Sequence, residues 1–161
     1  METPLLEIRD VKKYFPVKKV HGKEITVKAV DSINLKINQG EIVGLVGESG
    51  CGKSTLGKSI LKLHEITGGQ ILFHGEDITN YNERQMRPLR EKIQIIFQDP
   101  YASLNPRMSV FDIIAEPLLV HHLYQDKADL EKKVLDLLHR VGLDDYHANR
   151  YPHEFSGGQR Q

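Results

Sequence analysis

The sequence contains Gly47-Glu48-Ser49-Gly50-Cys51-Gly52-Lys53-Ser54-Thr55, which fits the pattern GxxxxGK[ST]. An apolar run, residues 42–46, precedes this stretch, and an amphipathic segment, residues 53–63, follows it. That order predicts a strand, a glycine-rich loop and a helix, the setting in which such a pattern forms a phosphate-binding P-loop. We therefore predict that residues 47–55 bind the phosphates of a nucleotide.

Each residue type in the loop has a chemical reason. Glycines let the backbone turn so that successive N–H groups point at one anion. A helix that begins near Gly52 adds its unpaired N–H groups and the positive end of its dipole. We predict that Lys53 places its charge on the β- and γ-phosphates, as a catalytic residue, and that the Ser54 hydroxyl is a ligand of Mg²⁺.

The composition of the chain argues against several classes of protein. The chain has 161 residues, 22 Lys plus Arg and 22 Asp plus Glu, so no net charge attracts nucleic acid or an anionic membrane. Its apolar runs are shorter than the roughly 18 residues of a membrane span, and its first residues do not resemble a signal peptide. A single cysteine fits a reducing cytosol. We expect a soluble cytosolic chain unless a partner holds it at a membrane.

The pattern before the glycine-rich loop predicts two antiparallel strands and then a different one. Residues 5–15 alternate in polarity and are expected to end at Pro16, with a hairpin or loop over residues 18–23. Residues 33–37 alternate as well and are followed by a turn at 38–40. Residues 42–46 do not alternate, which predicts a central strand buried on both faces.

The remainder of the chain changes from sheet to helix. We expect a strand and hairpin at 70–77, a short helical piece at 83–89 and an apolar strand at 93–97. Helices are then expected from Ser109, with an end or kink at Pro117, and over residues 127–141, with Asp126 as N-cap and an apolar stripe that includes Val141. This change divides the chain into a core subdomain, 1–105, and a helical subdomain, 106–161.

Two further segments carry a family resemblance. Phe155-Ser156-Gly157-Gly158-Gln159-Arg160-Gln161 closely resembles the signature motif of ATP-binding-cassette (ABC) ATPases, and Gln98 resembles the Q-loop glutamine of that family. The resemblance covers essentially the whole chain. It implies an α/β fold: a P-loop NTPase core of the ABC ATPase type, with N-terminal antiparallel β strands, an α-helical subdomain and the C-terminal part of the core missing.

A longer stretch indicates a branch of the family. Ile95-Ile96-Phe97-Gln98-Asp99-Pro100-Tyr101-Ala102-Ser103-Leu104-Asn105-Pro106-Arg107-Met108 resembles the oligopeptide and dipeptide importer ATPases, especially the second of their two ATPase subunits. The resemblance implies a subunit that couples ATP binding and hydrolysis to peptide uptake. It also implies that the subunit lies on the inner face of the cell membrane. Its direct partners would be membrane permeases, and its indirect partner an extracytoplasmic peptide-binding protein.

The resemblance also assigns roles to individual residues. Two ATPase subunits would form a head-to-tail dimer, in which Ser156, Gly157, Gly158 and Gln159 approach the γ-phosphate of ATP held by the other subunit's P-loop. Gln98 would sense the γ-phosphate and Mg²⁺, as a catalytic and metal-binding residue, and signal to the permeases. Tyr14 would stack on adenine, although Phe15 is one position away and either ring could belong to the core.

Some features have simpler interpretations. Cys51 could have a lowered thiol pKa at a helix N-terminus, but we favour a small residue that fills the loop. His121 and His122 invite a metal hypothesis, yet adjacent residues do not share a helical face. The lysine pairs 12–13 and 18–19 fit a solvated strand end better than a nucleic-acid site.

The loop 100–108 and the helices after it resemble the surface that receives the coupling helices of the transporter. Phe111, Ile113 and Ile114 could contribute to that surface, though core packing explains these apolar residues equally well.

The family's later elements are not found in this sequence. An apolar strand that ends in an Asp-Glu pair, and a switch histidine, should follow the signature motif; Asp144-Asp145 instead follows a helix and a glycine. We interpret the sequence as an N-terminal fragment or a truncated product, expected to bind ATP weakly at most and not to hydrolyse it. The alternatives are an inactive nucleotide-binding remnant, a soluble non-transport ABC ATPase, and a P-loop kinase or GTPase, which the signature motif disfavours.

Overall fold

The computed structural model describes residues 3–20, 23–97 and 103–160. The chain forms two compact units, Met1–Gln94 and Ile95–Gln161. The first unit holds the sheet and the P-loop, and the second is helical.

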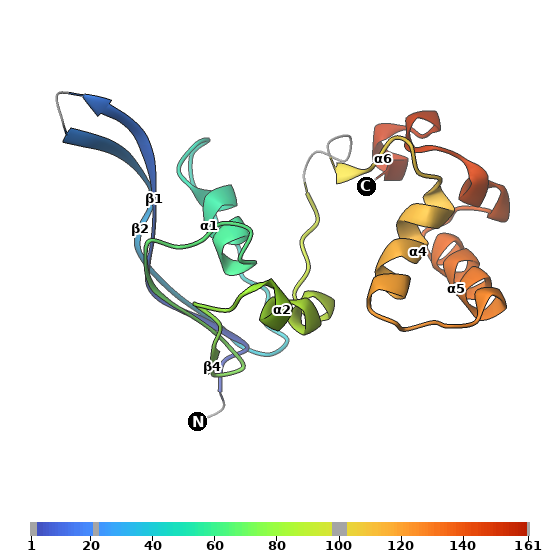
Figure 1. The fold of residues 1–161 in the computed structure, drawn as a ribbon, viewed down its shortest axis with the longest axis horizontal. Coiled ribbons are helices and arrows are strands. Elements are labelled where there is room, and N and C mark those ends of the chain that lie inside the picture. The colour runs from blue at the N-terminus through green and yellow to red at the C-terminus, as the bar shows by residue number, and fades with distance from the viewer. Residues whose placement is uncertain (1–2, 21–22, 98–102, 161) are drawn as a thin grey trace. The chain divides into compact units, whose positions relative to one another are not determined.

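Four strands make one antiparallel sheet in the first unit. They follow the order β2-β1-β3-β4, and each pair of neighbours is antiparallel (Figure 1). Their bounds are β1 Leu6–Val20, β2 Lys23–Ile37, β3 Gly68–Phe73 and β4 Glu76–Asp77. The predicted N-terminal antiparallel strands and the hairpin near residues 70–77 are confirmed. So is the end of β2, where the Glu41 N–H donates to the Asn38 carbonyl at 3.2 Å.

The prediction that Pro16 ends the first strand is wrong, since β1 continues through it to Val20. β3 pairs with β1 only between Leu6 and Lys12, so beyond that point β1 has β2 as its one neighbour. Figure 1 shows β1 and β2 running on together past the rest of the sheet. Proline is tolerated there because a strand with one free edge has positions whose N–H group needs no partner in the ladder.

One apolar core joins the sheet to the short helices of the first unit. α1 (Lys53–Ile60) contributes Leu56, and α2 (Glu83–Met86), which continues into the 3-10 helix η1 (Arg87–Glu91), contributes Met86. The buried members of this core are Leu6, Ile8, Val11, Val30, Leu56, Ile71, Phe73, Ile78 and Met86. α1 ends three residues earlier than predicted, and Leu63 lies beyond it with an exposed side chain.

Two predicted strands, the central strand at residues 42–46 and the apolar strand at 93–97, are not formed. Residues 42–46 and 93–97 have no strand pairing among the described residues, and several of their side chains face solvent. Ile42 is 98% exposed, Val46 is 94% exposed and Ile96 is 82% exposed. A strand buried on both faces requires hydrogen-bonded neighbours at its edges, and in the described part of the chain these runs have none. The apolar pattern therefore predicted buried strands at residues 42–46 and 93–97, and several of these side chains are instead exposed.

A carboxylate near the edge of the core gives the sheet an acid-sensitive contact. Glu7 accepts a hydrogen bond from Arg9 Nη2 at 2.7 Å, and Lys36 Nζ, opposite it on β2, lies 2.9 Å from its other oxygen. These contacts, the Arg9 hydrogen bond first, lower the pKa of Glu7 from 4.5 to about 2. Because the folded-state pKa is the lower one, the stabilisation is present above pH 4.5 and is lost as the pH falls towards 2.

We therefore expect Glu7→Gln to lower stability at pH 7 and to flatten its dependence on pH below 4.5. Urea denaturation of both proteins at pH 7 and pH 3, followed by circular dichroism, checks this. The control is Glu131→Gln, at an exposed position of the other unit. Equal losses of stability on acidification in Glu7→Gln and in the unmodified chain would contradict the prediction.

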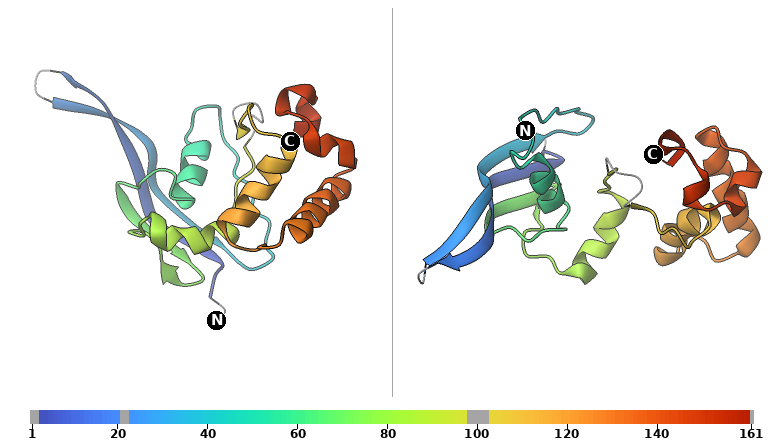
Figure 2. Two further views of the ribbon diagram at one scale, coloured as in Figure 1. Left: turned by 45° about the vertical axis from the view of Figure 1, so that its right-hand side comes forward. Right: turned by 90° about the horizontal axis from the view of Figure 1, so that it is seen from above.

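The second unit is a set of helices around its own core. α4 (Val110–Val120) and α5 (Lys127–Arg140) lie side by side (Figure 2) and bury Ala115, Leu130, Val134 and Leu138, together with Ala148. The 3-10 helices η2 (Asp145–Asn149) and η3 (Pro152–Glu154) follow, and α6 (Gly157–Arg160) is the last element.

The predicted caps of the two long helices are confirmed. Ser109 Oγ accepts the Asp112 N–H at 3.1 Å, and Asp126 Oδ1 accepts the Ala128 N–H at 2.8 Å. Gly142 follows α5 with φ 78°, the left-handed conformation that favours glycine after a helix.

Two details of the helical prediction need correction. Of the two alternatives predicted at Pro117, an end or a kink, the end is wrong: α4 runs on to Val120, and the His121 N–H donates to the Pro117 carbonyl at 3.1 Å. Val141 does not belong to the buried stripe of α5: it is 72% exposed, because it is the C-cap residue and its backbone has left the helical face.

Candidate nucleotide-binding site

The glycine-rich loop turns through left-handed backbone conformations before α1. Gly50 has φ 81° and Gly52 has φ 97°, values that residues with a Cβ rarely adopt. Cys51 lies between the two glycines, and its N–H donates to the Glu48 carbonyl at 3.3 Å. The Leu56 N–H donates to the Gly52 carbonyl at 2.9 Å, and this hydrogen bond closes the first turn of α1. The loop therefore ends directly at a helix N-terminus, as the pattern predicted.

β2 supports the end of this loop. A Cβ added to Gly52 would lie 2.0 Å from the Ala29 carbonyl oxygen, which is far inside any permitted contact. The backbone of the loop is thus seated directly on the backbone of β2. Only glycine permits this approach, which fixes where α1 starts relative to the sheet.

Lys53 folds back over the loop. Its Nζ donates to the Gly47 carbonyl at 2.7 Å and to the Glu48 carbonyl at 2.6 Å, and it lies 3.5 Å from Cys51 Sγ. The ammonium is therefore held above the turn, next to the backbone that would surround a phosphate. Cys51 is an exposed free cysteine whose sulfur packs toward Gly47, where an added Cβ would be 2.7 Å from Sγ.

The helix N-terminus keeps its donors available for an anion. Gly52 caps α1 without a side-chain hydrogen bond, and the first turn holds no acidic residue. Ser54, in this turn, has an exposed side chain. Because Mg²⁺ in nucleotide sites takes phosphate and water as most of its ligands, one hydroxyl from the protein fits its requirements. Among the described residues no three His, Cys, Asp or Glu side chains gather as a metal site.

A cavity of about 380 Å³ opens beside Lys53. Its walls come from β2, from the apolar run before the loop and from the start of α1. The lining residues are Lys28, Ala29, Val30, Asp31, Ile33, Leu45, Val46, Cys51, Gly52, Lys53 and Leu56. Asp31 pairs with Lys28 on this wall, which leaves Lys53 and the helix N-terminus as the groups that suit the cavity to an anionic ligand.

Tyr14, on β1, is hydrogen-bonded to a residue of the cavity wall. Its hydroxyl donates to Asp31 Oδ1, and Lys28 Nζ lies 5.1 Å from the centroid of its half-exposed ring. The hydrogen bond to the Asp31 carboxylate raises the pKa of Tyr14. Phe15, the alternative aromatic, instead meets His64 edge-on at 5.7 Å and has Lys13 Nζ 4.7 Å from its ring centroid. Of these two rings, the Tyr14 ring carries the described hydrogen bond to a residue of the cavity wall.

The signature segment forms the start of α6. Ser156 Oγ accepts the Gln159 N–H at 3.4 Å, and Gln159 Oε1 accepts the Ser156 N–H at 3.0 Å. Gly157 and Gly158 meet nothing within 4 Å at the position of an added Cβ, and Phe155 anchors the segment in a buried position. The two glycines therefore present bare backbone to their surroundings, which is what close approach of a phosphate requires.

The ABC transporter family matches residues 30–161 of the chain, which is most of its length. The chain belongs to the ABC transporter family.

Relatives within the ABC transporter family include peptide transport proteins. The chain is 53% identical over 162 aligned residues to the oligopeptide transport ATP-binding protein OppF of Bacillus subtilis (strain 168), an alignment that covers 100% of this chain and 52% of the relative. It is 44% identical over 162 residues to the dipeptide transport ATP-binding protein DppF of Escherichia coli (strain K12), with 100% and 48% covered. The chain thus spans about half the length of these relatives.

A solved ABC structure supports the expected fold class. The dimeric, post-hydrolysis structure of the ATP-binding cassette MJ0796 bound to ADP and Pi has a TM-score of 0.82 with this chain. The two are 26% identical, and the match covers 96% of this chain and 65% of the cassette. The prediction of an α/β ABC ATPase fold with an N-terminal antiparallel sheet is confirmed.

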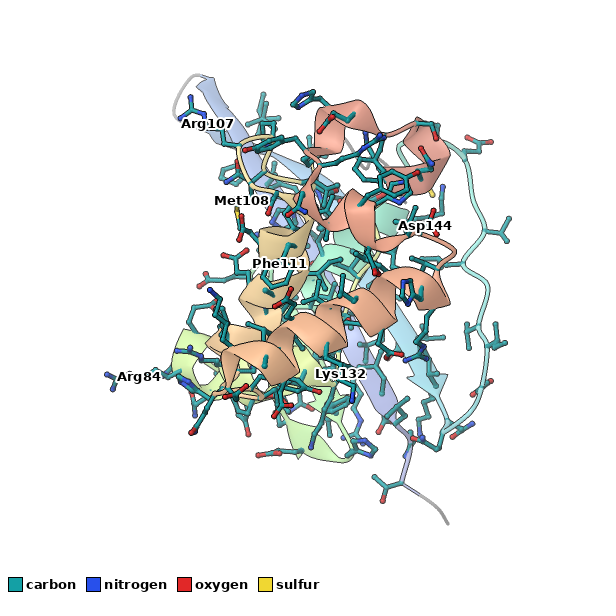
Figure 3. All side chains as sticks on the ribbon, turned by 90° about the vertical axis from the view of Figure 1, so that its right-hand side faces the viewer. Arg84, Arg107, Met108, Phe111, Lys132 and Asp144 are labelled. Carbon is teal, nitrogen blue, oxygen red and sulfur yellow. The ribbon has the colours of Figure 1, made fainter. Side chains whose placement is uncertain are left out.

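The structure describes only some of the other residues that were predicted to belong to an ABC site. Gln98 lies outside the described residues, and so do the first residues of the loop 100–108. Arg107 and Met108 project from the described part of that loop, and Phe111 follows on α4 (Figure 3). Phe111 and Ile114 pack against the helical core while staying partly exposed. No helix among the described residues is long and apolar enough to cross a membrane.

Sequence reasoning missed Lys28 and Asp31, which line the cavity beside Lys53. Both lie on β2, and Lys28 stands opposite Tyr14 in the β1–β2 register. A hairpin register deduced from the sequence could have paired Tyr14 with Lys28. The predicted strand end at Pro16 and the choice left open between a hairpin and a loop at residues 18–23 did not fix that register.

Proposed function

We propose that this chain is the nucleotide-binding part of an ABC importer subunit that couples ATP binding and hydrolysis to the uptake of oligopeptides or dipeptides. The observation that supports it most strongly is the loop around Lys53, with its left-handed glycines, its helix N-terminus and its ammonium held over the turn. The peptide substrate rests on the named functions of the relatives.

In this proposal ATP and Mg²⁺ occupy the first unit. The backbone of residues 47–55 surrounds the phosphates, Lys53 neutralises the β- and γ-phosphates, and the Ser54 hydroxyl is a ligand of Mg²⁺. Tyr14 stacks on the adenine. Gln98 approaches the γ-phosphate and Mg²⁺ and passes the state of the nucleotide to the membrane subunits.

The partners follow from the same proposal. Ser156, Gly157, Gly158 and Gln159 contact the γ-phosphate held by a second ATPase subunit, in a head-to-tail dimer; MJ0796, a related cassette, is dimeric in its solved structure. The loop 100–108 and α4 contact membrane permeases, which an extracytoplasmic peptide-binding protein supplies with substrate. The subunit then works at the cytoplasmic face of the membrane.

We expect the 161-residue chain to bind ATP weakly and not to hydrolyse it. The P-loop is present, but the sequence holds no apolar strand that ends in an Asp-Glu pair to bind Mg²⁺ and polarise the attacking water. Titration with MgATP, followed by ¹H–¹⁵N NMR, should shift the amides of residues 47–55. Phosphate release above that of a Lys53→Ala variant would contradict the expectation on hydrolysis, and unchanged loop amides at millimolar MgATP would contradict the proposed site.

A further inference from the structure

Asp31 connects the phosphate end of the candidate site to its aromatic end. The residue is part of the cavity wall beside Lys53, and its carboxylate accepts the Tyr14 hydroxyl and lies 3.2 Å from Lys28 Nζ. We propose that Asp31 is a positioning residue, which fixes the Tyr14 ring for stacking on the base of a nucleoside triphosphate and holds Lys28 on one face of that ring. The inference rests on the proposed function, since it concerns the base end of the same site.

Tyr14 is held at its backbone and at its hydroxyl. Its backbone N–H donates to Thr67 Oγ1 at 3.2 Å, from the segment just before β3, and its hydroxyl reaches Asp31 on β2. A half-exposed ring without the second contact would be free to change rotamer and would lose that freedom when a base stacked on it. Fixing the ring in advance removes this cost from binding.

Lys28 covers one face of the Tyr14 ring and leaves the other face for the base. Its Nζ stands 5.1 Å from the ring centroid, within the range of a cation–π contact, while its charge is paired with Asp31. Because the ammonium occupies this face, we assign the opposite face to the purine. Asp31 thus acts on the base through two neighbours and does not touch it.

The experiment compares a ligand that has a base with one that lacks it. The 161-residue chain and its variants are titrated with MgATP and with magnesium tripolyphosphate, and each dissociation constant is measured by ¹H–¹⁵N NMR. Asp31→Ala and Tyr14→Phe each remove the hydroxyl contact and should weaken ATP binding about fivefold. Neither should weaken tripolyphosphate binding. The double variant should be no worse than Asp31→Ala alone, because Asp31→Ala already removes the contact that Tyr14→Phe removes.

Two asparagine variants provide a matched comparison. Asp31→Asn keeps an acceptor for the Tyr14 hydroxyl but loses the charge that holds Lys28, so its loss of ATP affinity should be smaller than that of Asp31→Ala. Asp10→Asn removes another strand carboxylate, paired with Lys12 at 2.8 Å, and should leave ATP affinity unchanged.

The outcomes separate this inference from the proposed function. Unchanged ATP affinity in Asp31→Ala, or an equal loss of tripolyphosphate affinity, overturns the positioning role while the phosphate site stands. If neither ligand binds the unmodified chain, the proposed function fails and the inference fails with it.

Discussion

Replacing Lys53 with alanine should weaken MgATP binding to this chain by at least about tenfold, the loss that follows from removing one charge-assisted contact to phosphate. The ammonium stands over the turn, 2.6–2.7 Å from two loop carbonyl oxygens, so a phosphate that enters the loop meets it directly. In the complete importer subunit that we propose, the same change should abolish transport-coupled hydrolysis, because the β- and γ-phosphates would lose their neutralising charge.

The matched control for this variant is Lys58→Ala. Lys58 belongs to the last turn of the same helix and is not part of the cavity wall, so the two variants lose the same charge from one element. Titration of both with MgATP should show a large loss only for Lys53→Ala. Equal affinities in the two variants, or unchanged hydrolysis by a complete Lys53→Ala subunit, would refute the assignment of the P-loop.

A second large effect is expected from adding one methyl group to the loop. Gly52→Ala would place a Cβ 2.0 Å from the Ala29 carbonyl oxygen and would hold alanine at φ 97°. The left-handed backbone alone costs roughly 1–2 kcal/mol for a residue with a Cβ. The clash with backbone adds to this, so the loop should leave β2 and the chain should lose both stability and ATP binding.

Gly57→Ala tests whether this effect depends on position. Gly57 lies inside α1, and a Cβ there meets nothing within 4 Å. Alanine should stabilise the helix by roughly 0.5–1 kcal/mol and leave ATP binding intact. Urea denaturation and MgATP titration of the two variants check the contrast. A Gly52→Ala chain as stable as the unmodified protein, with full ATP binding, would show that the close contact with Ala29 is not required.

Local chemistry explains why much of the site could be predicted. The P-loop pattern, the caps at Ser109 and Asp126 and the glycine at position 142 each act within a few residues, so the pattern contains both partners of the interaction. The antiparallel start of the chain was predictable for a similar reason, since its alternating residues place one face of each strand in a core.

The sequence by itself therefore determined the phosphate-binding loop, the helix boundaries set by caps, and the family through the signature segment. The tertiary structure decided what depends on distant neighbours. Residues 42–46 have the composition of a central strand, but they remain exposed because no described strand pairs with them. Pro16 stays within β1 because only one side of the strand is paired there. Tyr14 meets Lys28 because the register of β1 and β2 places the two opposite, and its hydroxyl reaches Asp31 further along β2. Hydrogen-bond partners across strands are not encoded in a local pattern, which is why the contacts of Tyr14 with Lys28 and Asp31 became visible only in the tertiary structure.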